Sequence, residues 1–287
     1  MSSGASAPGI VLTRRDSVSL KSYFEKNRKR LRKRKRLIVF LSILAILGLT
    51  TSTYAWFTVN TFAGVQDFEL NISTGEDLRV SMENHGSDIE QYVHVITNDM
   101  IDSYLRKYNT SLKDMLLAPV TTNNGSSFSF EDGTSVKENE RGTYLEFKCW
   151  FIGTRDMYVH LTTEGVENDE TKGVPTTKAS TKSPSPQSDI VKAIRMGFQT
   201  DTDGNKTWEP NKGASVTRLT TFDLPSGEMD YNNSNQLFAL DKLTPKQATL
   251  RLWMEGEDPE CDNDVQGANL SVELSFVGCD ENGNPIS

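Results

Sequence analysis

The chain has 287 residues, 36% of them hydrophobic, which is enough for a packed core in one large or two small domains. Residues 1–36 hold twelve Lys and Arg against Asp16 and Glu25, a net charge of +10. Because the whole chain carries −8, residues 37–287 carry −18. This asymmetry excludes an evenly charged protein: two electrostatically opposite pieces meet at Leu37.

An apolar run, residues 37–49 (LIVFLSILAILGL), joins the two pieces, and only Ser42 and Gly48 interrupt it. Counted through Phe57, the segment has 21 residues, close to the ~20 that a helix needs to cross a bilayer. The first interpretation of residues 37–57 is therefore a transmembrane helix that contacts the lipid bilayer along its length.

The same segment has the order of a secretory signal: basic residues, an apolar run, then small residues. Thr53 and Ala55 supply the small side chains required for a signal peptidase cut before Trp56. Both interpretations stay open. In each, the basic residues remain in the cytoplasm by the positive-inside rule, and the acidic remainder is exported to the membrane surface or the extracellular side.

The basic tract NRKRLRKRKR, residues 27–36, has a second interpretation as a nucleic-acid or nuclear-targeting segment. Its position directly before the apolar run favours the topological role, so we expect no nucleic-acid partner. The organisation predicted is a basic cytoplasmic leader (1–36), a membrane or signal segment (37–57) and an exported domain (58–287). Residues 1–27 form a long Ser-rich leader with no assigned role.

After residue 57 the apolar residues alternate with a period of two, which is typical of strands with one buried face. The turn signals IGTR (152–155) and DTDGN (201–205) each predict a hairpin. Seven or more such strands favour an antiparallel β-sandwich. The predicted inward sets are Phe68, Leu70 and Ile72; Leu78, Val80 and Met82; Leu145, Phe147, Cys149 and Phe151; Met157, Val159 and Leu161; Ile194, Met196 and Phe198; Leu250, Leu252 and Met254; and Leu270, Val272, Leu274 and Phe276.

Two segments depart from this alternation. Between residues 88 and 107 the apolar residues recur at steps of three and four, which predicts one accessory helix over part of that range. Residues 162–189 are rich in Thr, Ser, Pro and Lys and nearly free of large apolar side chains. They are expected to be a mobile loop within one domain, with a linker between two domains as the alternative.

The sequence offers no catalytic motif. His85, His94 and His160 lack the spacing of a zinc-binding helix, and His160 should face solvent because it alternates with inward Val159 and Leu161. Neither a nucleophile elbow nor a phosphate-binding or dinucleotide-binding loop is present. We therefore assign no catalytic residue, no metal ligand and no cofactor.

Asp201, Asp203 and Asn205 have the spacing that opens a calcium loop. Gly204 comes two places early, and Lys212 stands where the bidentate glutamate is needed. A hairpin turn accounts better for these residues.

The segment EGEDPECDND (255–264) gathers six acidic residues, which could form a weak cation site or a solvated acidic loop. The solvated loop is favoured, because adjacent carboxylates in a flexible loop are usually hydrated. The six are Glu255, Glu257, Asp258, Glu260, Asp262 and Asp264.

Three cysteines leave an odd thiol whatever their pairing. Cys149 lies on the inward face of its strand and is expected to be a small buried hydrophobe. Cys261 and Cys279 each follow a strand, and if these strands form one hairpin the two thiols lie roughly 25–30 Å apart. This separation is too large for a disulfide, so both are expected unbonded.

Several segments together resemble the camelysin and TasA-type surface proteins of Gram-positive spore formers. They are the junction TSTYAWFTVN, the strands YLEFKCWF and DMYVHL, the partial motif LAPVTTNNG and the closing LRLWMEGEDPECDNDVQGANLSVELSF. The likeness spans most of residues 50–277. It implies a jelly-roll-like sandwich, export through a dedicated signal peptidase of the SipW type with cleavage similar to the bond after Ala55 and, in the TasA type, assembly into matrix fibres.

Cleavage before Trp56 would free an apolar N-terminal segment able to complete the sheet of a neighbouring subunit by strand addition. The alternative is that it forms the first strand of its own domain. The candidate donor residues are Trp56, Phe57, Val59, Phe62 and Val65.

The function predicted is therefore an exported or membrane-anchored surface protein that is structural or adhesive, a possible biofilm-matrix subunit. It would associate with itself through sheet edges and exposed aromatics such as Trp253. Two alternatives are kept: a camelysin-like secreted metallopeptidase, and a membrane-tethered module that binds a ligand such as a polysaccharide.

Overall fold

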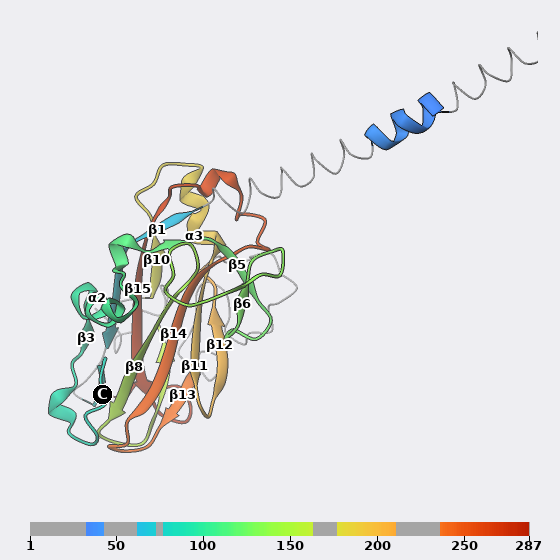
Figure 1. Cartoon of the computed structure of the whole chain (residues 1–287). Coiled ribbons are helices and arrows are strands. Elements are labelled where there is room, and N and C mark those ends of the chain that lie inside the picture. Colours follow the sequence, from blue (N-terminus) through green and yellow to red (C-terminus); the bar gives the residue numbers. More distant parts are fainter. Residues whose placement is uncertain (1–32, 43–61, 73–76, 163–176, 211–235, 287) are drawn as a thin grey trace, which may run out of the picture. The chain divides into compact units, whose positions relative to one another are not determined.

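The computed structural model describes residues 33–42, 62–72, 77–162, 177–210 and 236–286, which fall into two units that divide after Trp56 (Figure 1). In the first unit, residues 33–42 are helical and every one of their side chains is exposed. Within the described ranges, no helix is both long and apolar enough to span a bilayer. Most of the predicted membrane segment, residues 43–57, lies outside these ranges.

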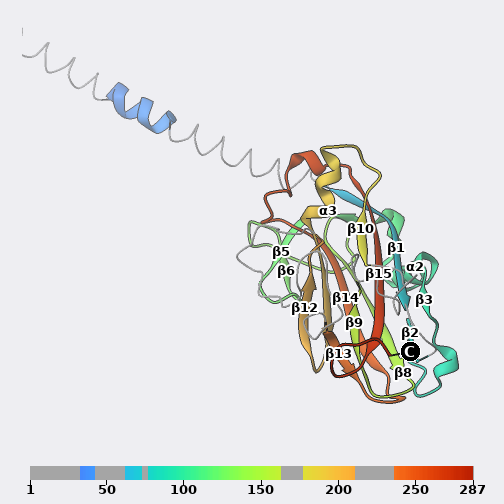
Figure 2. The ribbon, with the colours of Figure 1, turned by 180° about the vertical axis from the view of Figure 1, so that it is seen from behind.

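The second unit is mainly β and its described strands form two sheets (Figures 1 and 2). The first sheet has the order β13-β9-β15-β1-β3, with β10 also on β15 and β4 also on β1. Its strands are β1 (Ala63–Ile72), β3 (Val95–Ile96), β4 (Leu116–Leu117), β9 (Met157–Leu161), β10 (Lys178–Ser180), β13 (Gln236–Leu240) and β15 (Asn269–Cys279).

The second sheet is centred on β14, which pairs with β11, β8 and β5. Strand β12 lies beyond β11, β2 lies beyond β8, and β6 and β7 continue from β5. Its strands are β2 (Leu78–Ser81), β5 (Pro119–Thr122), β6 (Phe128–Ser129), β7 (Ser135–Val136), β8 (Leu145–Gly153), β11 (Ile194–Thr200), β12 (Gly204–Trp208) and β14 (Lys246–Glu255).

Both sheets are mixed, which corrects the expectation of a wholly antiparallel sandwich. Strand β1 runs parallel to β15, with Phe68 opposite Val272, and β14 runs parallel to β5, with Met254 opposite Pro119. The other pairs of named strands are antiparallel. Alternation in a sequence shows which face of a strand is buried but not the direction of its neighbour.

One predicted hairpin is confirmed and the other is wrong. Strands β11 and β12 pair across the DTDGN turn. Strands β8 and β9, on either side of IGTR, belong to different sheets, and so do β14 and β15, which flank the acidic segment. Both connections therefore cross between the layers.

The two sheets pack face to face through aromatic rings. Phe68 of β1 meets Phe147 of β8 with ring centroids 5.1 Å apart, and Phe276 of β15 meets Phe151 of β8 at 5.1 Å. The inward sets predicted from the sequence all line this core, with Ile72 and Met82 only partly buried. The period-two pattern therefore located the core correctly.

The sheets are joined along one side by backbone pairing. The amide and carbonyl groups of Val80 in β2 and Val93 exchange two hydrogen bonds of 2.8 Å. The next residue, His94, accepts a 2.8 Å hydrogen bond from the Ile72 amide of β1. Hydrogen bonding thus passes from the second sheet into the first, so this side of the sandwich is curled like half of a barrel.

A second, smaller core lies on the outer side of the second sheet. It consists of Val120, Phe128, Tyr144 and Trp253, with Phe128 stacked on Tyr144 at 4.1 Å and in edge contact with Trp253 at 5.1 Å. The covering strands β5 and β6 come from residues 118–130. Trp253 is only 1% exposed, so its predicted role as an exposed aromatic is wrong.

The predicted accessory helix is present only in part. Helix α2 (Asn98–Leu105) continues into the 3₁₀ turn η2 (Arg106–Tyr108), and it buries Ile101 and Leu105. Before it lie the turn η1 (Ile89–Gln91) and strand β3, because pairing with β1 holds Val95 and Ile96 in an extended conformation. The turn η3 (Leu112–Asp114) follows.

Part of the predicted mobile loop is ordered. Residues 163–176 lie outside the described ranges, but β10 pairs with β15, and the Ser275 amide donates a 2.8 Å hydrogen bond to the Thr177 hydroxyl. The turns η4 (Gln187–Asp189) and α3 (Ile190–Ala193) then lead into β11, whereas η6 (Asn263–Val265) leads into β15. The expectation of a mobile loop is therefore wrong for residues 178–180.

Candidate functional site

A buried arginine, Arg195, is the centre of a cluster of charged side chains inside the described domain. It is the second residue of β11 and lies opposite Trp253 of β14. Its side chain is 2% exposed. Its Nη1 donates hydrogen bonds to the carbonyls of Lys192 (3.0 Å) and Ile194 (2.8 Å), which tie it to the end of α3.

Two carboxylates flank the other terminal nitrogen of Arg195. Nη2 donates a hydrogen bond to Oδ2 of Asp258, whose side chain is fully buried. The same Nη2 lies 2.8 Å from Oε1 of Glu209, the residue after β12, in an ion pair that lacks hydrogen-bond geometry. One guanidinium therefore serves two acidic groups from different elements.

A third carboxylate, Glu255, ends β14 and is 3% exposed. Its Oε2 accepts a 3.0 Å hydrogen bond from Nε1 of Trp253, and its Oε1 accepts one of 3.2 Å from the Glu257 amide. This pair of bonds fixes the end of β14 where the chain enters the loop 256–268.

The electrostatics of this site, which we call the Arg195 cluster (Arg195, Glu209, Glu255 and Asp258), favour neutral carboxyl groups. Burial raises the pKa of Glu209 from 4.5 to about 7; the nearby Arg195 lowers it, and Asp258 and Glu255 raise it further. Burial also raises the pKa of Glu255, although the hydrogen bond from Trp253 opposes this. The cluster therefore holds protons at pH values where exposed glutamates are ionised.

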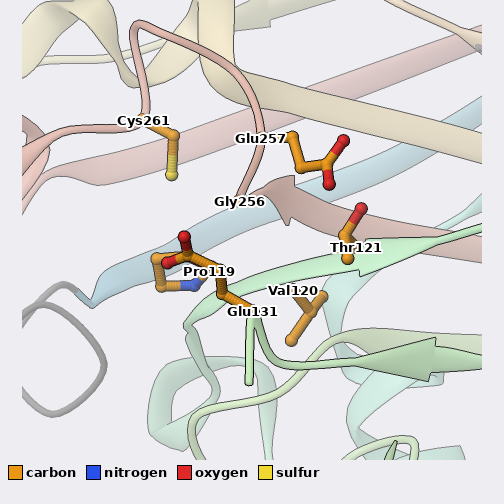
Figure 3. A pocket seen from close by; sticks show the side chains of 7 residues that line it. All are labelled: Pro119, Val120, Thr121, Glu131, Gly256, Glu257 and Cys261. Carbon is orange, nitrogen blue, oxygen red and sulfur yellow. The ribbon is translucent and has the colours of Figure 1, made fainter. Parts of the chain in front are cut away.

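A small space of about 40 Å³ adjoins the cluster between β5 and the loop after β14 (Figure 3). Thr121, Glu257 and Cys261 lie around it, and Glu131 approaches from the side of Pro119. The volume is enough for a single water molecule and too small for an organic substrate.

All three cysteines lie in the described part of the chain as free, buried thiols. Burial raises the pKa of each, and near Cys261 the carboxylates of Asp258 and Glu255 raise it further. A protonated buried thiol is a poor nucleophile, so none of the three is activated for catalysis. Cys261 and Cys279 are unbonded as expected, but the reason differs, because their strands are in separate sheets.

A wider groove of about 610 Å³ lies between the start of β9, the end of β13 and the C-terminal residues 280–286. Asp156, Asp241, Asp280 and Glu281 line it. Arg155, the one basic residue of the lining, is paired with Asp77 at 2.5 Å. The groove is therefore acidic.

The histidines predicted from the sequence remain apart. His85 stacks edge-on with Tyr92, with centroids 5.4 Å apart, and His94 is exposed. His160 is fully buried, so the expectation that it faces solvent is wrong. Among the described residues, no group of three or more His, Cys, Asp or Glu side chains could hold a metal ion.

The acidic residues singled out in the sequence have two different environments. In DTDGN, Asp201 is exposed, and Asp203 accepts hydrogen bonds from Thr200 (2.8 Å) and Lys246 (2.9 Å), as expected for a closed turn. In the segment 255–264, the expectation of a wholly solvated loop is wrong for Glu255 and Asp258, because Trp253 and Arg195 bind them inside the domain.

The residues proposed for cleavage and strand donation lie mostly outside the described ranges. Thr53, Ala55, Trp56, Phe57 and Val59 all do. Val65 belongs to β1 and is 2% exposed, with its register partner Leu270 in β15. Phe62, just before β1, lies against Gly142, whose φ of +84° and contact with the Phe62 ring leave no space for a side chain.

Comparison with known proteins found no matching family model, no matching curated protein and no matching solved structure. Function is therefore inferred below from the residues of the chain and their surroundings.

Sequence reasoning missed Arg195 and Glu209. Arg195 occupies an outward position of its strand, where a charged residue is ordinarily solvated. A useful signal was present: the outward positions of β11 and β14 carry the large residues Arg195 and Trp253 opposite one another, directly before an acidic segment. Large or charged residues paired in this way indicate a covered outer face.

Proposed function

We propose that this chain is an exported structural or adhesive protein of the cell surface, whose acidic β domain lies outside the membrane. Residues 37–57 would hold it there, or cleavage after Ala55 would release it. The observation that carries the proposal is the helix at residues 33–42, where five consecutive large apolar side chains, Leu37 to Leu41, are 55–62% exposed.

These five residues cover the full circumference of a helix, because successive side chains are about 100° apart. A helix that packs on a protein surface has a single apolar stripe, whereas one that is apolar all round suits the interior of a bilayer. Transfer of each such side chain out of water is worth about 1.5–3 kcal/mol. Insertion into lipid would remove the apolar side chains from water on every side of the helix.

The charges at the start of this helix support an orientation of the chain across the membrane. Lys33, Arg34, Lys35 and Arg36 precede the apolar residues without a break. Basic residues beside a membrane segment favour the cytoplasmic side. The β domain, on the other side of the segment in the sequence, would then be outside.

The mechanism we propose for the domain is self-association through strand edges. The likeness to camelysin and TasA-type proteins, and a jelly-roll-like arrangement of the sandwich, belong to this same proposal. A chain cut before Trp56 would carry Trp56, Phe57 and Val59 as a free apolar end that can add to a neighbour. Trp253 has no part in it, because that side chain is buried.

A membrane-tethered binding module is the second candidate, favoured by the acidic groove between β9, β13 and residues 280–286. Its four carboxylates would select a cationic ligand. Binding of a basic peptide that is lost at high salt would support it, and the metallopeptidase alternative would need stoichiometric zinc in the purified protein.

The test of the main proposal is the mass and N-terminal sequence of the protein from cell envelope and culture fluid, with protease treatment of intact cells. A chain that begins at Trp56 in the fluid means release, and an intact chain in the envelope means anchoring. In both cases external protease should digest the β domain of cell-associated protein. A full-length chain found in the cytosol and protected from protease would contradict the proposal.

A charge within the apolar run provides a matched pair of variants. Leu47→Lys should reduce membrane association, because Leu47 is the middle residue of the segment 37–57 and a lysine at the centre of a spanning helix costs about 2.5–3.5 kcal/mol. Leu243→Lys, at a 37% exposed leucine of the β domain, makes the same change outside the run and should leave membrane association unaltered.

A further inference from the structure

The Arg195 cluster contains more acidic than basic groups. Arg195 faces three carboxylates, Glu209, Asp258 and Glu255. A second cation at this end of the described domain, Lys192 of α3, is paired with Asp189 at 3.0 Å. Several carboxylates held near one guanidinium away from water repel one another, so the closed arrangement favours a bound proton.

The three carboxylates differ in the hydrogen bonds that they would weaken or lose on protonation. Asp258 accepts a charge-assisted hydrogen bond from Arg195, and Glu255 accepts hydrogen bonds from Trp253 and the Glu257 amide. Glu209 only lies beside Arg195 Nη2, without hydrogen-bond geometry. Glu209 is therefore the carboxyl group that most readily takes the proton.

The charged groups that act on Glu209 come from several of the described elements. Strand β11 supplies Arg195, β14 supplies Glu255, and the loop after β14 supplies Asp258 and Glu260. Lys192 of α3 and Asp189 of η4 form their own pair, and Lys192 acts on Glu260. Among the described groups that act on Glu209, Arg195 is thus the one cation and the others are acidic.

The loop 256–268 depends on these contacts. Asp258 fastens it to Arg195, the Gly256 amide donates a 3.0 Å hydrogen bond to Val120, and Gln187 donates one of 2.9 Å to the Gln266 carbonyl. Figures 1 and 2 show α3 and this loop at the same end of the domain. Cys261 is a residue of this loop, and its side chain is buried in the closed arrangement.

We propose that protonation of Glu209 controls the position of loop 256–268. When Glu209 is neutral the loop closes over Arg195, and when Glu209 is ionised the loop opens more often. Ionised Glu209 competes with Asp258 for the guanidinium of Arg195, and the two carboxylates repel each other. The loop would therefore be closed in acidic surroundings and would open more often as the pH rises, exposing Cys261.

The sign of the effect follows from linkage. Glu209 binds its proton more tightly with the loop closed, where its pKa is about 7, than in water, where it is near 4.5. The closed form is therefore favoured below pH 4.5, and this preference is lost as the pH rises from 4.5 through about 7. Above about pH 8 the frequency of opening should no longer change with pH.

The test is thiol labelling of the full-length protein in detergent micelles from pH 5 to pH 8.5, with the label located by peptide mass spectrometry. Wild type is compared at each pH with Glu209→Gln, which keeps the shape and removes the charge, so that the intrinsic pH dependence of the reagent cancels. Glu69→Gln, at an exposed glutamate of β1, is the matched control.

The ratio of the Cys261 labelling rate in wild type to that in Glu209→Gln should rise about tenfold or more between pH 5.5 and pH 8 and then level off. Glu69→Gln should follow wild type. A ratio that stays constant over this range would overturn the proposal.

If Glu209→Gln does not fold, wild type alone tests the proposal, with Cys279 as the reference thiol. Labelling of Cys261 should then rise with pH relative to Cys279 in β15, which the loop does not cover. A ratio of Cys261 labelling to Cys279 labelling that does not change with pH would equally overturn the proposal.

Discussion

Arg251 and Glu146 lie directly opposite one another on the neighbouring strands β14 and β8, and Nε of Arg251 donates a 2.7 Å hydrogen bond to Glu146 Oε2. Their side chains are 8% and 12% exposed. Arg251 also donates to Gln199 Oε1 at 2.7 Å and to the Gly125 carbonyl at 3.1 Å. One side chain therefore joins β14 to β8, to β11 and to the segment covering the sheet.

Loss of the arginine should be costly. Arg251→Met leaves Glu146 buried without its cation and should lower the free energy of unfolding by about 3–5 kcal/mol. Urea denaturation of the full-length protein in detergent measures this. The double variant Arg251→Met, Glu146→Leu should recover much of the loss, and a double variant no more stable than the single one would contradict the pairing argument.

Stability should fall as the pH rises through the range set by Glu209. Its pKa is raised to about 7 in the folded domain, so the folded state holds a proton that the unfolded state releases between pH 4.5 and 7. Thermal unfolding of wild type and Glu209→Gln should therefore differ in slope over this range, with wild type losing more stability. Parallel curves would exclude Glu209 as the titrating group.

The contact between the sheets should depend on Phe276, whose ring meets Phe151 at 5.1 Å and Phe198 at 6.0 Å. Phe276→Ala should reduce the free energy of unfolding by about 3–5 kcal/mol, because the cavity lies between two sheets that cannot both collapse into it. Phe276→Leu should cost less, and equal losses would show that ring volume is not the decisive quantity.

Val65 separates the two interpretations of the N-terminal segment. As a 2% exposed residue of β1 it supports its own domain, so Val65→Ala should lower the stability of the monomer by about 2 kcal/mol. A variant that loses assembly while the melting temperature of the monomer is unchanged would instead favour strand donation at this position. Differential scanning calorimetry and light scattering together give both readouts.

Sequence patterns were sufficient for the core and insufficient for its connections. Each predicted inward set is determined by burial of one strand face, which alternation reports directly, as for Phe147 and Phe151. Pairing depends on residues distant along the chain: β8 pairs with β14 rather than with β9, although only residues 154–156 separate β8 from β9.

The candidate site was hidden for a related reason. Trp253 and Arg195 occupy outward positions and are buried only because other segments cover them, Phe128 over Trp253 and the loop of Asp258 over Arg195. No local period records such coverage. The acidic segment was visible in the sequence, but its buried cation was more than sixty residues away, as the separation of Asp258 from Arg195 shows.

The parallel pairing of β1 with β15 also determines how the domain would bear a mechanical load. Their register runs from Gly64 opposite Asn269 to Ile72 opposite Phe276. A pull between the chain before β1 and the chain after β15 would act on opposite ends of this strand pair. The hydrogen bonds between the strands would then be loaded together in shear rather than opened one after another. A domain tethered to a cell through its first strand would resist stretching at that pair.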